Sequence, residues 1–341
     1  MRKSVVVIFI SLVLSTLLCK PALADGNLSW LDGFKLGGYG SAGINLQRDQ
    51  EAQAAINGVS LLLTWNGDGR LSFFSELELE RPLSFHDDNQ FSRKEGHLDL
   101  ERFYFDYNIS EKINFRAGRF LTPNSRWNLL HAPPLVWTSS RPLSTTQLFP
   151  TVTNGMMLLG AVPFKNSAFE YKVFGELLED QELDERDARQ FEHVRGLRLS
   201  VKNQSDIGIS LLSFREKGLN AASYRMLGLD VVSTVKNIEI SAEAFQRFDT
   251  DNRDGGSGAY LQTAVPLNGL GFFNSPALQD WYWITRLETL QRSDLGANER
   301  WLVGATWRVK PTQLLKLEFT GGSAELPESP RGFSASFALF F

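Results

Sequence analysis

The chain has 341 residues and a formal net charge of −4. This slightly acidic balance argues against nucleic acid as a partner, and a single cysteine, Cys19, excludes a disulfide framework or a thiolate metal site. No segment after residue 24 approaches 18 consecutive apolar residues, which excludes a helical membrane protein. Nothing in the sequence indicates a cofactor or a metal, and we expect neither.

Residues 1–24 predict a secretory signal peptide. Arg2 and Lys3 come first, an apolar run ends at Leu18, and small residues precede Asp25. We expect cleavage after residue 24, which would remove three basic residues and Cys19 and change the formal net charge from −4 to −7. Two alternatives stay open: a membrane anchor, although the apolar run is short for one, and a lipoprotein site at Cys19, although Leu18 stands where a small residue is required.

Alternating apolar and polar residues, bounded by turn residues, predict sixteen strands within a single domain at residues 25–341. The predicted strands cover residues 33–47, 56–65, 69–81, 97–108, 112–121, 154–162, 168–178, 191–202, 206–215, 222–234, 237–248, 258–267, 278–292, 299–309, 312–321 and 331–341.

The predicted connections alternate between short and long. Tight turns follow every second strand, as at residues 66–69 and 203–206, and longer polar loops such as 82–96 and 122–153 lie between them; only the turn at 268–277 is long for its class. Turns on one side and loops on the other are typical of a transmembrane antiparallel β-barrel. A secreted β-sandwich shares the composition but has no reason to sort its loops in this way.

The last predicted strand places Phe333, Ala335, Phe337, Leu339 and Phe341 on one face and ends on an aromatic residue. In this the sequence resembles Gram-negative outer-membrane proteins. The resemblance implies location in the outer membrane, contact with outer-membrane lipid and lipopolysaccharide, and recognition of Phe341 by the barrel assembly machinery.

A second resemblance is narrower. The run Ala117-Gly118-Arg119-Phe120-Leu121-Thr122-Pro123 is similar to the strand that leads into the constriction loop of the phosphate-selective porins O and P. It implies a sixteen-stranded porin whose third long loop, residues 122–153, folds inward, and a homotrimer, to which the small residues near 33–43 would contribute packing. The lumenal Arg and Lys run of those porins cannot be mapped onto this chain, and phosphate selectivity is not carried over.

The third loop and its flanks contain no acidic residue between Lys112 and Phe169. We therefore predict a cationic pore constriction, because field lines concentrate where low-dielectric walls approach each other. An alternative is that these arginines dock the loop by salt bridges to wall carboxylates such as Glu76 and Glu78. The residues predicted for the constriction are Arg116, Arg119, Arg126 and Arg141.

Strand alternation also predicts a lumen wall of mixed charge. Charged rings and pore-lining donors select the solutes that pass through a channel, although such residues can also be merely solvated and paired with each other. The wall residues predicted on this ground are Glu76, Glu78, Arg102, Lys172, Arg198, Arg286 and Arg308.

Two acidic stretches, residues 176–192 and 249–256, allow a divalent-cation site, but they are more typical of solvated loops because neither has the ligand pattern of a calcium loop. The alternatives to a channel are an outer-membrane hydrolase and a barrel of structural or adhesive role. His97 with Asp99 offers a dyad, but no GxSxG nucleophile motif accompanies it. The sequence thus predicts a non-enzymatic, water-filled diffusion channel for small hydrophilic solutes, with a preference for anions.

Overall fold

The computed structural model describes residues 33–47, 52–67, 69–86, 91–92, 96–145, 148–179, 190–217, 221–251, 253–269, 275–292, 296–323 and 331–341. The predicted signal peptide lies outside this part of the chain, as does most of the acidic stretch that follows residue 179.

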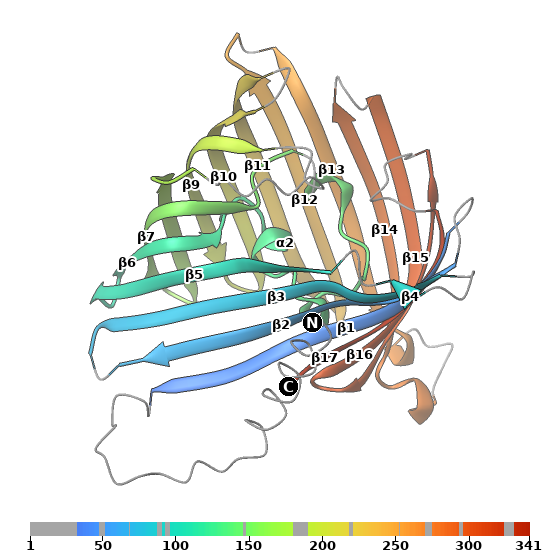
Figure 1. Ribbon diagram of the computed structural model, residues 1–341. Coiled ribbons are helices and arrows are strands. Elements are labelled where there is room, and N and C mark those ends of the chain that lie inside the picture. The colour runs from blue at the N-terminus through green and yellow to red at the C-terminus, as the bar shows by residue number, and fades with distance from the viewer. Residues whose placement is uncertain are drawn as a thin grey trace, which may run out of the picture.

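Strands make up nearly all of the described chain, and sixteen of them are long (Figure 1). Their bounds are β1 Phe34–Gln47, β2 Gln53–Asn66, β3 Leu71–His86, β5 His97–Ser110, β6 Ile113–Leu121, β7 Val152–Phe164, β8 Ser167–Glu176, β9 Phe191–Lys202, β10 Ser205–Glu216, β11 Ala222–Val235, β12 Ile238–Asp249, β13 Asp254–Pro266, β14 Trp281–Arg292, β15 Gly296–Lys310, β16 Gln313–Gly322 and β17 Gly332–Phe340. The two-residue strand β4, Phe91–Ser92, pairs only with β3.

The strands form one closed antiparallel barrel. Each long strand pairs with the next one along the chain, and the first strand also pairs with the last, with Tyr39 opposite Phe340 and Gln47 opposite Gly332. Closure pairs the backbone groups of both terminal strands, so the described sheet has no long free edge. The prediction of a sixteen-stranded antiparallel barrel is confirmed.

The ends of several strands differ from the predicted ones. Strand β3 continues past Pro82 to His86 because Arg81 and Pro82 fall at a bulge opposite Asn57, where proline does not remove a ladder hydrogen bond. Strand β14 starts at Trp281 because the 3₁₀ turn η5, Pro276–Leu278, occupies the predicted beginning. The third long loop ends at residue 151, since β7 already includes Val152.

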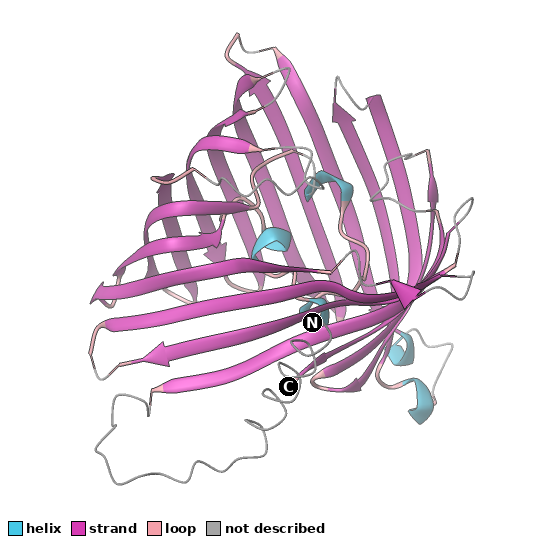
Figure 2. Ribbon diagram, viewed as in Figure 1, coloured by secondary structure: helices cyan, strands magenta, loops and turns pink. Residues whose placement is uncertain are grey.

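Alternation along each strand separates an outward apolar set from an inward polar set. In β3, Leu77 and Leu79 are exposed to the outside, while Glu76, which precedes Leu77, is fully buried on the inner side. Among the described residues, no helix is both long and apolar enough to cross a membrane. The short helices belong to connections, and Figure 2 shows one of them, α2, between the front and back walls of the barrel.

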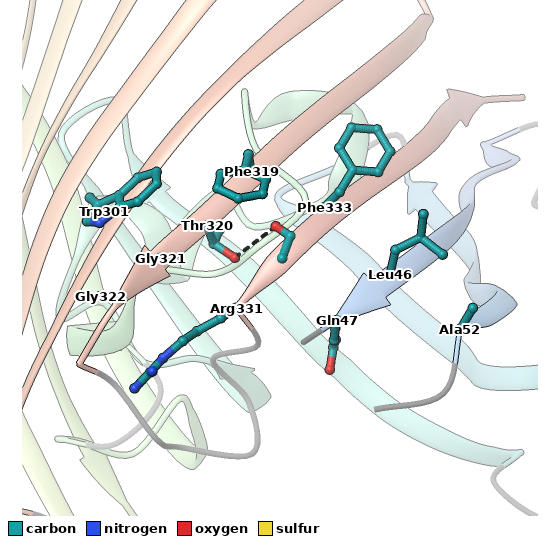
Figure 3. Close-up of a pocket in the computed structure, with 11 residues that line it drawn as sticks. Leu46, Gln47, Ala52, Trp301, Phe319, Thr320, Gly321, Gly322, Arg331 and Phe333 are labelled. Atoms are coloured by element: carbon teal, nitrogen blue, oxygen red, sulfur yellow. Dashed lines mark hydrogen bonds between the residues drawn. The ribbon is translucent and has the colours of Figure 1, made fainter. Parts of the chain in front are cut away.

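An apolar groove of about 650 Å³ lies on the outer surface where β16 ends and β17 begins. Figure 3 shows Trp301, Phe319, Phe333 and Leu46 along it, with a hydrogen bond of 3.4 Å from the Thr320 hydroxyl to the Gly332 carbonyl beneath. The groove belongs to the outward face and is separate from the barrel interior.

Gly118 of β6 provides a test of the barrel geometry. Its φ is +132°, and an added Cβ would lie 2.2 Å from the Phe103 carbonyl oxygen. We expect Gly118→Ala to lower the free energy of unfolding by roughly 1–3 kcal/mol, because both the backbone conformation and the close approach favour glycine. Urea unfolding of the refolded protein measures this.

Gly175 of β8 is the matched control, since an added Cβ there meets nothing within 4 Å. Gly175→Ala should leave the unfolding midpoint nearly unchanged. Equal midpoints for the two variants would contradict the geometry given for β6.

Candidate functional site

The connection between β6 and β7, residues 122–151, contacts inward-facing wall residues along much of its length; we call it the inner loop. It contains α2 (Arg126–Leu129), η2 (Pro133–Leu135) and η3 (Leu143–Thr145). Helix α2 begins where the Ser125 hydroxyl accepts a hydrogen bond of 3.0 Å from the Asn128 backbone N–H. Its five prolines (at 123, 133, 134, 142 and 150) and small polar residues explain why neither a long helix nor a strand forms here.

Glu288 of β14 anchors the middle of the inner loop. Its carboxylate accepts hydrogen bonds from Arg286 Nε at 2.8 Å, from Arg300 Nε at 2.8 Å and from the Leu143 backbone N–H at 2.7 Å. Arg286 in turn donates to the Ser140 carbonyl at 2.9 Å, and Arg300 donates to the Arg141 carbonyl. All three charged side chains are almost completely buried, and each satisfies loop backbone groups that would otherwise be buried without partners.

Two further wall residues hold the stretch of the inner loop that precedes this anchor. Lys316 Nζ donates to the carbonyls of Pro133 at 2.6 Å and Thr138 at 3.1 Å. Glu318 accepts from the backbone N–H groups of Ser139 and Ser140. The loop therefore crosses the inner face of β16 as an ordered segment.

Apolar contacts hold the rest of the inner loop. Leu143, Leu148 and Phe149 are buried in a cluster with inward-facing residues of nine strands, and the Phe149 and Phe245 rings lie 4.9 Å apart. An apolar core inside the barrel was not among the predictions from sequence. The sequence feature that marks this core is a break in the alternation of apolar and polar residues, for example where Leu212 follows Leu211 in β10.

The four arginines predicted for the constriction have partners. Arg116 and Arg119 lie on β6 and not on the loop: Arg116 pairs with Asp106 at 2.7 Å, and Arg119 lies 4.0 Å from Asp99. On the loop, Arg126 pairs with Asp206 at 2.9 Å, and Arg141 donates to the Asn128 side chain at 2.9 Å. Docking occurs as the alternative reading foresaw, but these carboxylates belong to neither Glu76 nor Glu78. A role of the four arginines in solute selection stays a prediction.

The predicted wall residues all lie on inward-facing positions of their strands, but in two different environments. Arg286 is sealed under the inner loop, and Arg198 is buried in a pair with Asp230 at 2.6 Å. Glu76 is buried between Tyr39 and Arg102. Three of the predicted wall residues keep exposed surface: Glu78 on β3, Lys172 on β8 and Arg308 on β15.

Lys172 and Glu78 differ from most lumenal charges because neither forms a hydrogen bond or an ion pair with any other residue of the described ranges. The acid nearest to Lys172, Glu170, pairs with Lys202, and the charged neighbours of Glu78 are other acids, among them Glu76 and Glu80. Lys172 and Glu78 therefore line the lumen without an ion-pair partner among the described residues.

Two further charge groups lie near strand ends: one joins β10, β12 and β14 and was not predicted, and the other includes Glu179 and Glu192 of the acidic stretch that allowed a divalent-cation site. Glu216 binds Arg247 at 3.1 Å and Arg292 at 2.9 Å, which links alternate strands across the wall. At the rim of β8 and β9, the ligand atoms of Glu179, Glu192 and His193 lie within 4.8 Å of one another.

This rim cluster already has a cation. Lys217 Nζ lies 3.0 Å from Glu179 and 3.3 Å from Glu192. The hydrogen bond from Lys217 lowers the pKa of Glu179, and the same bond raises the pKa of Lys217. A metal ion at this place would have to displace the lysine.

The Glu288 anchor can be tested by Glu288→Gln. We expect a loss of roughly 3–5 kcal/mol in the free energy of unfolding, because two buried arginines would lose their counter-ion, together with faster protease cleavage within residues 122–151. Urea unfolding and limited proteolysis provide the two readouts.

Glu170→Gln is the control, because the Glu170–Lys202 pair at 2.8 Å is half exposed on its lysine side. Its expected cost is about 0–1 kcal/mol. If Glu288→Gln cost no more than this control and left proteolysis unchanged, Glu288 would not be the anchor.

Comparisons with known proteins give structural similarity only. No protein-family model matches the chain, and no curated protein is similar to it in sequence. Solved structures do match over nearly the whole chain. OmpF of Salmonella typhi, in complex with daunomycin, superimposes with a TM-score of 0.61 at 9% identity, covering 91% of this chain and 98% of that one.

Two further structures show the same likeness. The anion-selective porin from Comamonas acidovorans has a TM-score of 0.56 at 12% identity and covers 90% of this chain and 97% of its own. The trimer form of OmpT, an outer-membrane protein of Vibrio cholerae, has a TM-score of 0.58 at 8% identity, covering 90% and 99%. At these identities the similarity shows the fold, a sixteen-stranded barrel of the outer-membrane porin type.

Proposed function

We propose that this protein is an outer-membrane porin, a water-filled channel through which small hydrophilic solutes diffuse passively. One observation carries the proposal: the inner loop seals one wall and leaves charges on the other accessible. Under the loop, the Arg286 and Glu288 side chains are 0% exposed. Across the barrel, the Arg116 and Asp106 side chains are 20% and 28% exposed although they pair with each other. Hydrated charges along one side of a barrel are what a path for polar solutes requires.

We propose further that the path prefers anions. Most lumenal arginines, including those predicted for the constriction, are held by carboxylates or by the inner loop. Lys172 and Arg308 are inward cations that keep exposed surface and form no ion pair within the part of the chain that the structure describes. Glu78 opposes them as an unpaired acid, so the preference should be modest. The anion-selective porin from Comamonas acidovorans shares the fold, and kinship with the phosphate-selective porins O and P rests on the sequence alone.

The proposal also includes the export, membrane insertion, lipid contacts and assembly of the protein. The outward apolar face supports contact with outer-membrane lipid and lipopolysaccharide, and the trimeric neighbour supports assembly as a homotrimer. Export with loss of residues 1–24 and insertion guided by Phe341 belong to the proposal on sequence grounds. On β1, the small residues Gly40 and Ala42 follow one another on the outward face and would allow a neighbouring copy to pack closely, whereas Gly38 is covered by the Phe341 ring.

The charge preference is tested by single-channel recording in planar bilayers under a salt gradient. Lys172→Gln should move the reversal potential toward cations, and Glu78→Gln should move it toward anions, because each removes an unpaired charge of one sign. Both shifts should grow as the salt concentration falls, since screening weakens.

Because Lys172→Gln and Glu78→Gln remove charges of opposite sign, their reversal potentials should shift in opposite directions. Shifts of the same sign, or none in either variant, would refute the role given to these two residues. Absence of steady conductance in the wild type would refute the channel and favour a barrel of structural or adhesive role, whose lumen the inner loop fills.

The membrane location is tested at Leu287, which is 64% exposed on the outward face of β14. Leu287→Lys should cost roughly 2–4 kcal/mol of folding free energy in lipid vesicles, because a lysine would face hydrocarbon near the middle of the strand. Ser223→Lys, near the end of β11, is the control, with an expected cost of about 0–1 kcal/mol. Equal costs would show that β14 does not face lipid.

A further inference from the structure

A second cavity, of about 430 Å³, lies inside the barrel at the end that carries the tight turns. Trp137 of the inner loop forms one side, and inward residues at the ends of β12, β14 and β15 form the other: Glu239, Tyr282 and Arg308. The sequence analysis treated Arg308 as one wall charge among several and gave Trp137 no role.

The aromatic part of this cavity is ordered by its own contacts. The Trp137 and Tyr282 rings are 4.6 Å apart with an angle of 42° between their planes, and Trp137 Nε1 donates to Glu239 at 2.8 Å. The Thr306 hydroxyl also donates to the Trp137 carbonyl at 2.7 Å. Both the position and the orientation of the indole are therefore set before any solute arrives, which lowers the ordering cost of binding.

Arg308 supplies a free cationic group. Its guanidinium carbon lies 4.4 Å from the centre of the Trp137 ring and 5.5 Å from that of Tyr282. Within the described ranges its side chain has no carboxylate partner and no hydrogen bond, and it is exposed to the lumen. Held by its face against the rings, a guanidinium keeps its N–H edge available, and this edge matches a carboxylate with two parallel hydrogen bonds.

The other polar groups of the cavity suit hydroxyl groups. Glu239 offers carboxylate oxygens, Asn237 an amide and Thr234 a hydroxyl. A carboxylate beside Arg308 would repel a simple small anion unless that anion also brings hydroxyl donors, and an aromatic ring offers an apolar face to the C–H side of a sugar ring. A concave site with an apolar floor and a few convergent polar groups is the usual form of a small-molecule site.

We propose that this cavity binds acidic sugars, a carboxylate on a hydroxylated ring, at the turn end of the lumen. The carboxylate pairs with Arg308, the ring packs against Tyr282 and Trp137, and the hydroxyl groups donate to Glu239. The proposal deepens the proposed channel function and rests on it, because a solute reaches the site through the lumen or through its mouth. It names the solute class that the channel favours.

Binding is measured by ligand-observed NMR on the full mature protein in detergent, with glucuronate as the probe and glucose and acetate as comparators. Glucuronate should bind at least about 10-fold more tightly than either comparator, because each of those lacks half of the recognised chemistry. Arg308→Gln should weaken glucuronate binding by about 10- to 100-fold, the range expected for a charge-assisted pair. Tyr282→Leu should weaken it several-fold.

Lys310→Gln is the matched control. It removes the same charge two residues along β15, at the same mouth but outside the cavity, and should change the affinity by less than 2-fold. Equal weakening by Lys310→Gln and Arg308→Gln would reduce the effect to general attraction at the mouth and overturn the site. Equal binding of glucose, or no binding of glucuronate, would overturn it as well.

Bilayer recordings of the same variants separate the two proposals. Normal conductance without glucuronate binding would refute the sugar site and leave the channel standing. Glucuronate binding without conductance would refute the channel while the site stands. If both hold, glucuronate should interrupt the ionic current of the wild type for longer than that of Arg308→Gln.

Discussion

Buried charge must be neutralised, and this constraint determines how the interior of the barrel is arranged. Glu288, Arg286 and Arg300 project from neighbouring strands into a space that water does not reach, and removing any one of them would leave an uncompensated ion. Their remaining hydrogen-bonding capacity goes to the backbone of the inner loop. The loop in turn needs these groups, because its irregular backbone forms little hydrogen bonding of its own. The buried wall charges and the backbone of the inner loop therefore satisfy each other's hydrogen-bonding groups.

The consequence is a barrel with two unlike halves. On one side, the loop covers the charges of β14 to β16, while its apolar core around Phe149 and Phe245 continues to residues of β5 to β12. On the other side, Arg116 and Asp106 pair in contact with solvent, and Lys172 and Glu78 have no partner among the described residues. Under the proposed channel function, solute selection depends on these accessible charges and on Arg308 at the turn end, since a charge that is fully neutralised and covered contributes little to the field along a path.

Strand number, closure and the direction of most wall side chains were within reach of the sequence, because a strand has an exact period of two and a closed barrel sorts its turns from its loops. The bulge opposite Asn57 was not, because it depends on which residue of β2 faces Pro82. The acid-free flanks indicated a functional loop, but the sequence did not reveal that Arg126 pairs with Asp206 of the wall or that Arg116 and Arg119 lie on β6.

The sequence by itself determined the barrel and the inward position of its charged residues, because both follow from local alternation. Only the tertiary structure decided which of those charges are free. Arg126 pairs with Asp206 eighty residues away, and Arg300 donates to the carbonyl of Arg141 in the inner loop packed against it. Trp137 meets Tyr282 and Arg308 in the same way. Such pairings depend on the path of one irregular loop through the barrel, and its path is set by long-range contacts that no periodic pattern encodes.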